Sequence, residues 1–265
     1  MSGTSRDGTT SPIGHGQPGR TVAPTALDES FVVGGGMAVG GTAQIATLGK
    51  TIAALLRDDI PRRLAAGDAT LWGPDARTEA SARLGWLTLA ATSRHLVSDL
   101  KAVRKELLAD GLDHVVLAGM GGSSLAPEVI CRTLGVELTV LDTTDPGQVR
   151  SALRKHLDRT VIVVSSKSGG TVETDSQRRA YWQALKDTGL SDAEVGRRFI
   201  IVTDPGSPLE AIGKQTGVRE IFLADPQVGG RYSALSAFGL VPAAIAGIDT
   251  ETLLDEAARL TPTLS

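Results

Sequence analysis

The sequence contains one cysteine and four histidines, and aromatic residues make up only 3% of it. Because Cys131 is the single cysteine in 265 residues, no disulfide can form within the chain, which is typical of proteins from a reducing compartment. No apolar run approaches the roughly 20 residues that a membrane-spanning helix needs. The N-terminus lacks the apolar centre of a secretory signal peptide. These shortages predict a soluble, cytoplasmic protein that does not bind a membrane.

An excess of positive charge is also missing. The formal net charge is −3, from 27 Lys and Arg against 30 Asp and Glu. Proteins that bind nucleic acid or an anionic membrane through a broad basic surface carry the opposite balance. We therefore expect no nucleic-acid partner. Hydrophobic residues make up 41% of the chain, which is enough for a sizeable core.

The composition changes twice along the chain. Residues 1–30 are rich in Gly, Ser, Thr and Pro, which predicts a disordered tail. Residues 31–110 form a predicted N-terminal helical segment, because apolar residues recur there at spacings of three and four. The helical patterns cover Ala43–Ala66, divided at Pro61, then Asp75–Leu89 and Ser93–Leu108. Residues 111–265 are predicted to form one further domain.

In residues 111–265, short runs rich in β-branched residues alternate with helical patterns. The predicted strands are Val115–Ala118, Glu137–Leu141, Val161–Ser165, Phe199–Thr203 and Glu220–Leu223. The predicted helices are Leu125–Leu134, Pro146–Leu157, Val172–Thr188 and Pro208–Thr216. This alternation predicts an α/β fold, a doubly wound parallel five-stranded sheet with helices on both faces. Ligands of such sheets bind at the carboxyl ends of the strands, near the point where the strand order reverses.

Two loops at that predicted edge have the composition of an anion site. The first, Gly119–Ser124, follows a strand and precedes a helix, and its glycines allow the backbone to approach a ligand closely. The second, Ser165–Thr174, is dense in hydroxyls, contains Lys167, and also precedes a helix. Hydroxyls, amides of a helix N-terminus and a lysine together suit a dianionic phosphate monoester.

Two other phosphate motifs fit less well. The Walker pattern, Gly-x-x-x-x-Gly-Lys-Ser/Thr, is absent, which disfavours a nucleoside triphosphatase. A dinucleotide fingerprint would need a third glycine where Ser124 stands. Asp142, at the end of the second predicted strand, could imitate the ribose-binding acid of that fingerprint, so this alternative stays open.

Three motifs give the sequence a resemblance to the glucose-6-phosphate isomerase family, whose domains have the flavodoxin-like sugar isomerase fold. The segments are Gly119-Met120-Gly121-Gly122-Ser123, Ser166-Lys167-Ser168-Gly169-Gly170-Thr171-Val172-Glu173-Thr174 and Val228-Gly229-Gly230-Arg231-Tyr232-Ser233. The second departs from the family at Ser168, where threonine is usual, but it keeps the hydroxyl. The overall sequence most resembles actinobacterial forms of the family, some of which are fused to transaldolase.

The resemblance implies a role for each matched position. Arg231 is expected to be catalytic, near C1 and C2 of the sugar. The expected substrate-binding residues are Gly122, Ser123, Ser166, Lys167, Ser168 and Thr171. The implied reaction interconverts glucose 6-phosphate and fructose 6-phosphate through a cis-enediol(ate), in glycolysis and gluconeogenesis. No cofactor and no metal is implied, and the full-length form is expected to be a homodimer.

The family's carboxylate base and its ring-opening histidine and lysine are expected downstream of Ser265. The resemblance therefore predicts a chain truncated before its catalytic base, without a second sugar isomerase domain. Two alternatives remain: a non-catalytic sugar-phosphate sensor, and the isomerase part of a transaldolase–isomerase protein.

Overall fold

The computed structural model describes residues 30–32, 38–40 and 42–264. The chain divides into two compact units, Met1–Thr51 and Ile52–Ser265. In the first unit, β1 (Ser30–Val32) pairs with β2 (Ala38–Gly40) in an antiparallel ribbon. The predicted disordered tail lies outside the described residues, apart from Ser30. The predicted division at residue 110 stays a prediction.

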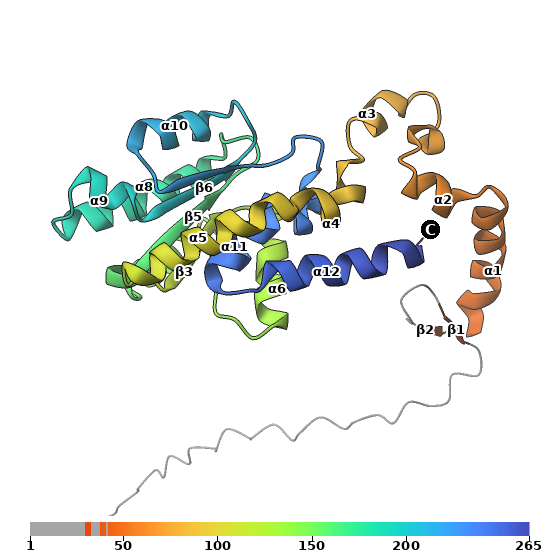
Figure 1. Ribbon diagram of the computed structural model, residues 1–265, viewed down its shortest axis with the longest axis horizontal. Helices are drawn as coiled ribbons and strands as arrows, with labels where there is room; N and C mark the ends of the chain where they lie inside the picture. Colours follow the sequence, from red (N-terminus) through yellow and green to blue (C-terminus); the bar gives the residue numbers. More distant parts are fainter. Residues whose placement is uncertain (1–29, 33–37, 41, 265) are drawn as a thin grey trace, which may run out of the picture. The chain divides into compact units, whose positions relative to one another are not determined.

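The second unit contains a five-stranded sheet, and all of its strands are parallel, as predicted (Figure 1). The strands are β3 (His114–Gly119), β4 (Thr139–Leu141), β5 (Thr160–Ser165), β6 (Phe199–Thr203) and β7 (Glu220–Leu223). Their order in the sheet is β4-β3-β5-β6-β7. Every residue of β3, β5 and β6 is buried, because helices cover both faces of these central strands.

Helices precede the sheet and connect its strands. Those before β3 are α1 (Thr42–Arg57), α2 (Ile60–Ala65), α3 (Arg77–Ser81), α4 (Leu89–Thr92) and α5 (Leu96–Ala109), with short 3-10 helices at Ala69–Trp72, Gly85–Thr88 and Ser93–His95. Those after β3 are α6 (Leu125–Thr133), α7 (Pro146–Leu153), α8 (Val172–Asp187), α9 (Asp192–Gly196), α10 (Pro208–Thr216), α11 (Ala237–Ala246) and α12 (Thr250–Leu260), with 3-10 helices η5 (Gly121–Ser123), η6 (Leu157–Arg159), η7 (Gly230–Leu235) and η8 (Thr261–Leu264).

The two faces of the sheet carry separate cores because successive strand residues point to opposite sides. In β3, Val115 and Leu117 pack with α5, α11 and α12, whereas Val116 and Ala118 pack with α8, α9 and α10. The same alternation continues along β5 and β6. The alternation predicted from sequence therefore produces a doubly wound sheet.

Helix α11 lies inside the first of these layers. Nine of its ten residues are buried, and they contact α5, α6 and β3. A helix that is apolar on all sides needs such enclosure.

Two predicted helices are wrong in extent. The predicted helix Asp75–Leu89 is broken, because α3 stops at Ser81 and the chain re-forms a helix only from Gly85. A Cβ on Gly85 would lie within 3.3 Å of side chains in the 225–228 segment, so this position is fixed by a tertiary contact. The predicted helix Pro146–Leu157 ends at Leu153, and His156 then adopts a left-handed conformation with φ of 53°.

Candidate functional site

The strand order reverses between β3 and β5. These strands are neighbours although β4 separates them in the sequence, and Gly119 at the end of β3 pairs in register with Ser165 at the end of β5. The chain leaves β3 towards α6, which packs against α11, and leaves β5 towards α8 on the opposite face of the sheet. Two loops that start side by side therefore diverge, and such a divergence opens a crevice.

The loop after β3 turns through η5. Gly121 has a φ of 57°, a conformation that residues with a Cβ rarely adopt. Gly122 lies against the backbone of Gly230, because a Cβ added to Gly122 would be 2.6 Å from the Gly230 carbonyl oxygen. Ser123 is buried at the rim of a cavity. The predicted strand, turn and helix are present, with a 3-10 helix that the sequence pattern did not indicate.

The loop after β5 is held by its own hydroxyls. Ser166 Oγ lies 3.0 Å from Thr171 Oγ1, and the Gly169 amide donates to Ser166 Oγ at 3.2 Å. When Ser166 donates to Thr171, the Thr171 proton is left for a ligand. Gly169 has a φ of 69°, and a Cβ there would be 2.8 Å from the Leu209 backbone nitrogen. The loop therefore requires glycine at this position.

The third motif leads into the 3-10 helix η7, which is the third segment of the site. Ser233 Oγ lies 3.0 Å from the Gly122 carbonyl and 2.7 Å from the Gly230 carbonyl, so it ties η7 to η5. Arg231 follows Gly230 and is exposed. In the described part of the chain, the Arg231 side chain makes no hydrogen bond or ion pair, so its guanidinium is available to a ligand.

These three segments surround a cavity of about 480 Å³. It is lined by Met120, Gly122, Ser123, Lys167, Ser168, Thr171, Asp204, Gly230 and Phe238. Five of the seven predicted site residues are therefore brought together. The other two do not line the cavity: Ser166 is buried beneath Thr171, and Arg231 follows the lining residue Gly230.

Asp204 is a cavity residue that sequence reasoning missed. Its Oδ2 lies 2.7 Å from Lys167 Nζ, and Lys167 Nζ also donates to the Pro226 carbonyl at 3.1 Å. A signal for it existed, because Asp204 directly follows β6 and so stands at the same carboxyl edge as the two predicted loops.

The cavity has the donors that an anion needs. The 16-residue helix α8 begins just after Thr171, and the Thr171 side chain makes no capping bond to it. Its first amides and the positive end of its dipole are therefore directed at the loop. Among the described residues, no group of three or more His, Cys, Asp or Glu side chains is placed to hold a metal ion.

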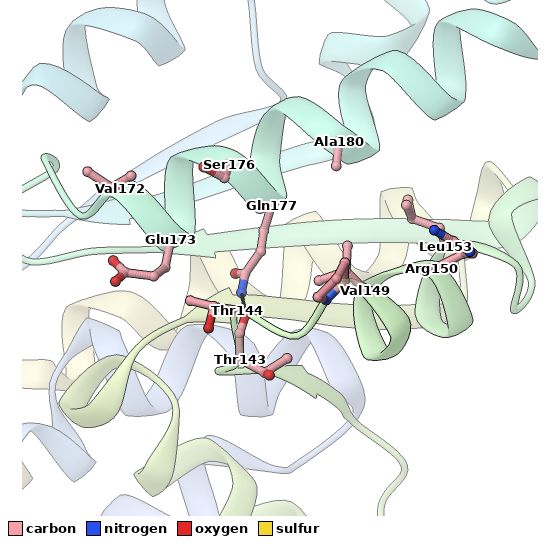
Figure 2. Close-up of a pocket in the computed structure, with 11 residues that line it drawn as sticks. Thr143, Thr144, Val149, Arg150, Leu153, Val172, Glu173, Ser176, Gln177 and Ala180 are labelled. Atoms are coloured by element: carbon pink, nitrogen blue, oxygen red, sulfur yellow. Dashed lines mark hydrogen bonds between the residues drawn. The ribbon is translucent and has the colours of Figure 1, made fainter.

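A second cavity, of about 550 Å³, lies beside α8 (Figure 2). It lies between α7, α8 and the residues that follow β4, and Gln177 Nε2 donates to the Thr143 carbonyl at 2.9 Å. Figure 2 shows Glu173 on α8 at this cavity, near Thr144. Glu173 is therefore not part of the hydroxyl-lined cavity, although it follows Thr171 by two residues.

None of the histidines with described side chains is among the residues that line the hydroxyl-lined cavity. His114 opens β3 at the amino edge of the sheet, where its Nδ1 is 2.8 Å from Thr160 Oγ1 and its Nε2 is 3.2 Å from Thr139 Oγ1. Burial, followed by repulsion from Lys155, lowers the pKa of His114. Its neutral form is thus a structural link between β3, β4 and β5.

No helix in the described part of the chain has the length and apolarity to cross a membrane.

Comparison with known proteins gives one consistent result. The profile of phosphoglucose isomerase matches residues 92–261. The glucose-6-phosphate isomerase of Cyanothece sp. is 35% identical over 187 residues, which cover 65% of this chain and 34% of that protein. The Thermus thermophilus enzyme of the same name is 34% identical over 194 residues, or 71% of this chain and 45% of the relative.

Solved structures agree. A hypothetical protein from Thermus thermophilus superposes with a TM-score of 0.65 at 30% identity, covering 80% of this chain and 49% of its own. A glucose-6-phosphate isomerase from Chlamydia trachomatis gives a TM-score of 0.54 at 27% identity, covering 76% and 39%. This chain thus spans between about a third and a half of the length of these relatives. With the profile matching well over half of its residues, the chain belongs to the phosphoglucose isomerase family.

Proposed function

We propose that this chain provides the phosphate-binding part of an aldose–ketose isomerase that interconverts glucose 6-phosphate and fructose 6-phosphate, in glycolysis and gluconeogenesis. The observation that carries the proposal is the convergence of three family motifs on one cavity at the switch point of the sheet. The proposed setting is the cytoplasm, with the full-length form as a homodimer.

In this proposal the phosphate lies on the loop between β5 and α8. Ser168 and Thr171 donate hydroxyl bonds to it from that loop, and Ser123 donates from the other side of the cavity. Ser166 acts on the phosphate indirectly, because its hydroxyl orients the hydroxyl of Thr171. Amides at the start of α8 add the dipole of a long helix.

The role proposed for Arg231 is to stabilise the negative charge of the enediolate. Two features support this role: Arg231 directly follows the lining residue Gly230 in the sequence, and no described side chain neutralises it. A guanidinium stays protonated throughout and can offer two parallel hydrogen bonds to the oxygens on C1 and C2. It cannot also remove a proton from carbon.

A general base must lie within about 3 Å of the proton that it removes. Asp204 is the carboxylate among the described lining residues, and it is engaged with Lys167. We therefore propose that the 265-residue chain binds sugar phosphate without turning it over. A coupled isomerase assay on the purified chain tests this, and turnover comparable to that of the Thermus thermophilus relative would contradict it.

Binding itself is tested by thermal unfolding with three additives. Glucose 6-phosphate at about 100 times its dissociation constant should stabilise the folded chain by about 2.7 kcal/mol, because it binds only that state. Inorganic phosphate should stabilise it less, and unphosphorylated glucose least. Equal shifts from glucose and glucose 6-phosphate would remove the phosphate site from the proposal.

A further inference from the structure

The cavity contains an ion pair that joins three loops. Lys167 belongs to the loop after β5, Asp204 to the loop after β6, and Pro226 to the loop after β7. The Lys167 ammonium donates to the Asp204 carboxylate and to the Pro226 carbonyl. Two of its three donors are therefore used inside the protein.

The first two loops are joined in other ways as well. The Asp204 amide donates to the Lys167 carbonyl at 3.3 Å, and Thr203 Oγ1 donates to the Ser166 carbonyl at 2.7 Å. Removing the Lys167 side chain would leave these two contacts in place. The loop after β6 would therefore stay attached to the loop after β5.

The third loop is bonded to the loop after β5 through Lys167. We call residues 225–232, which carry Gly230 and Arg231, the Arg231 segment. Outside the helical bonds of η7, the described hydrogen bonds of this segment are internal, apart from the one from Lys167 to the Pro226 carbonyl and the one from Ser233 Oγ to the Gly230 carbonyl. Ser233 then fixes the next residue to η5. Ala224, the residue before the segment, donates to the Thr203 carbonyl at 2.9 Å, so both ends stay attached without Lys167, whereas Pro226 in between would lose its hydrogen bond to the loop after β5.

Asp204 is the ion-pair partner of Lys167 in this arrangement. Its side chain is 18% exposed, and its Oδ1 is buried without a partner in the described structure. Burying a carboxylate without a partner is costly, and the Lys167 ammonium supplies the charge partner of this one. The pair neutralises itself, so the Lys167 charge is already matched before a phosphate arrives.

We propose that Lys167 and Asp204 are positioning residues: Asp204 holds the Lys167 ammonium where it donates to the Pro226 carbonyl, this bond latches the Arg231 segment to the loop after β5, and Lys167 does not serve as the charge partner of the phosphate. This rests on the proposed function for the identity of the ligand, but the latch is a property of the unliganded chain. It sets where Arg231 stands relative to a phosphate held by Ser168 and Thr171.

The test measures mobility and binding separately. Hydrogen exchange is followed at the amides of Gln227, Val228 and Tyr232, which are bonded within the Arg231 segment. Binding of inorganic phosphate and of glucose 6-phosphate is measured by calorimetric titration. The variants are Lys167→Met, Asp204→Asn and the double variant. Lys155→Met is the matched control, because it removes an ion pair with Glu137 at the amino edge of the sheet.

Either single variant should raise exchange at these amides about fivefold or more, and the double variant should add little, since the two residues act as one unit. Inorganic phosphate affinity should change less than about threefold, because the Lys167 charge is already matched by Asp204. Lys155→Met should change neither quantity. Lys167→Arg, which keeps the charge, should restore most of the protection.

A loss of about tenfold or more in phosphate affinity for Lys167→Met, with exchange unchanged, would make Lys167 a phosphate ligand and overturn the proposal. Unchanged exchange in Asp204→Asn would overturn it equally. That variant is isosteric, so it decides the question even if Lys167→Met does not fold. If the parent chain bound neither ligand, the proposed function would fail, while the exchange result would still decide the latch.

Discussion

Gly122→Ala tests the close approach of η5 and η7 on which the cavity depends. The added Cβ would lie 2.6 Å, 2.8 Å and 2.9 Å from the carbonyl oxygen, carbonyl carbon and Cα of Gly230. All three are backbone atoms, so no side-chain rotation can relieve the overlap. The two segments must separate by about 0.8 Å to bring the nearest contact to 3.4 Å.

That separation has two calculable effects. Overpacking of this kind costs about 1–3 kcal/mol, which for a domain of this size lowers the melting temperature by roughly 2–12 °C. It also stretches the 3.0 Å bond from Ser233 to the Gly122 carbonyl and displaces Arg231, the residue after Gly230. Glucose 6-phosphate should consequently stabilise the variant much less than it stabilises the parent chain.

The assay is thermal unfolding with and without glucose 6-phosphate, next to two glycine controls. Gly170→Ala should be neutral in stability, since its Cβ meets nothing within 4 Å and its φ is not positive. Gly121→Ala should cost about 1–2 kcal/mol through its left-handed conformation alone, without a clash. If Gly122→Ala had the same melting temperature and the same stabilisation by glucose 6-phosphate as Gly170→Ala, the backbone contact would not define the cavity.

Three further outcomes are expected. Thr171→Ala should weaken glucose 6-phosphate binding by about 1.5–3 kcal/mol in a titration, and Ser166→Ala by less, because Ser166 acts through Thr171; the reverse order would contradict these roles. The pKa of His114 is lowered in the folded state, so the unfolded chain binds more protons and the free energy of unfolding should fall as pH drops below about 6.5. Denaturant titrations from about pH 8 to about pH 5 should show a flatter dependence in His114→Gln, and equal slopes would remove His114 as the cause. Burial raises the pKa of the Cys131 thiol to about 11, so a thiol reagent at neutral pH should label it only at the rate of unfolding.

The strands were predictable because local composition decides them. The predicted ranges Phe199–Thr203 and Glu220–Leu223 coincide with β6 and β7, whereas β3 is one residue longer than predicted at each end and β5 is one residue longer at its start. The apolar runs of β3, β5 and β6, rich in β-branched residues, are typical of strands buried on both faces, as these are. The strand Glu137–Leu141 is shorter, starting at Thr139, where pairing with β3 begins.

The site was predictable only where a motif lies in one stretch of sequence. Ser123, Ser168 and Thr171 could be expected at one edge because parallel strands bring their carboxyl ends together. Asp204 could not be assigned a partner, since its contact with Lys167 depends on how β5 and β6 align. The contact of Gly85 with the 225–228 segment likewise joins residues about 140 positions apart, and it divides a helix that local periodicity favours.

Helix α11 has a consequence for biosynthesis. It contributes Phe238, Leu240 and Val241 to the core that covers one face of β3 and β5, yet it follows β3 by more than a hundred residues. During translation, that face of the sheet cannot close until residue 246 has left the ribosome. The exposed valines and leucine of β3 and β5 on that face would then be available to chaperones or to other nascent chains. Interruption of synthesis before α11 should therefore yield an aggregation-prone intermediate rather than a smaller folded domain.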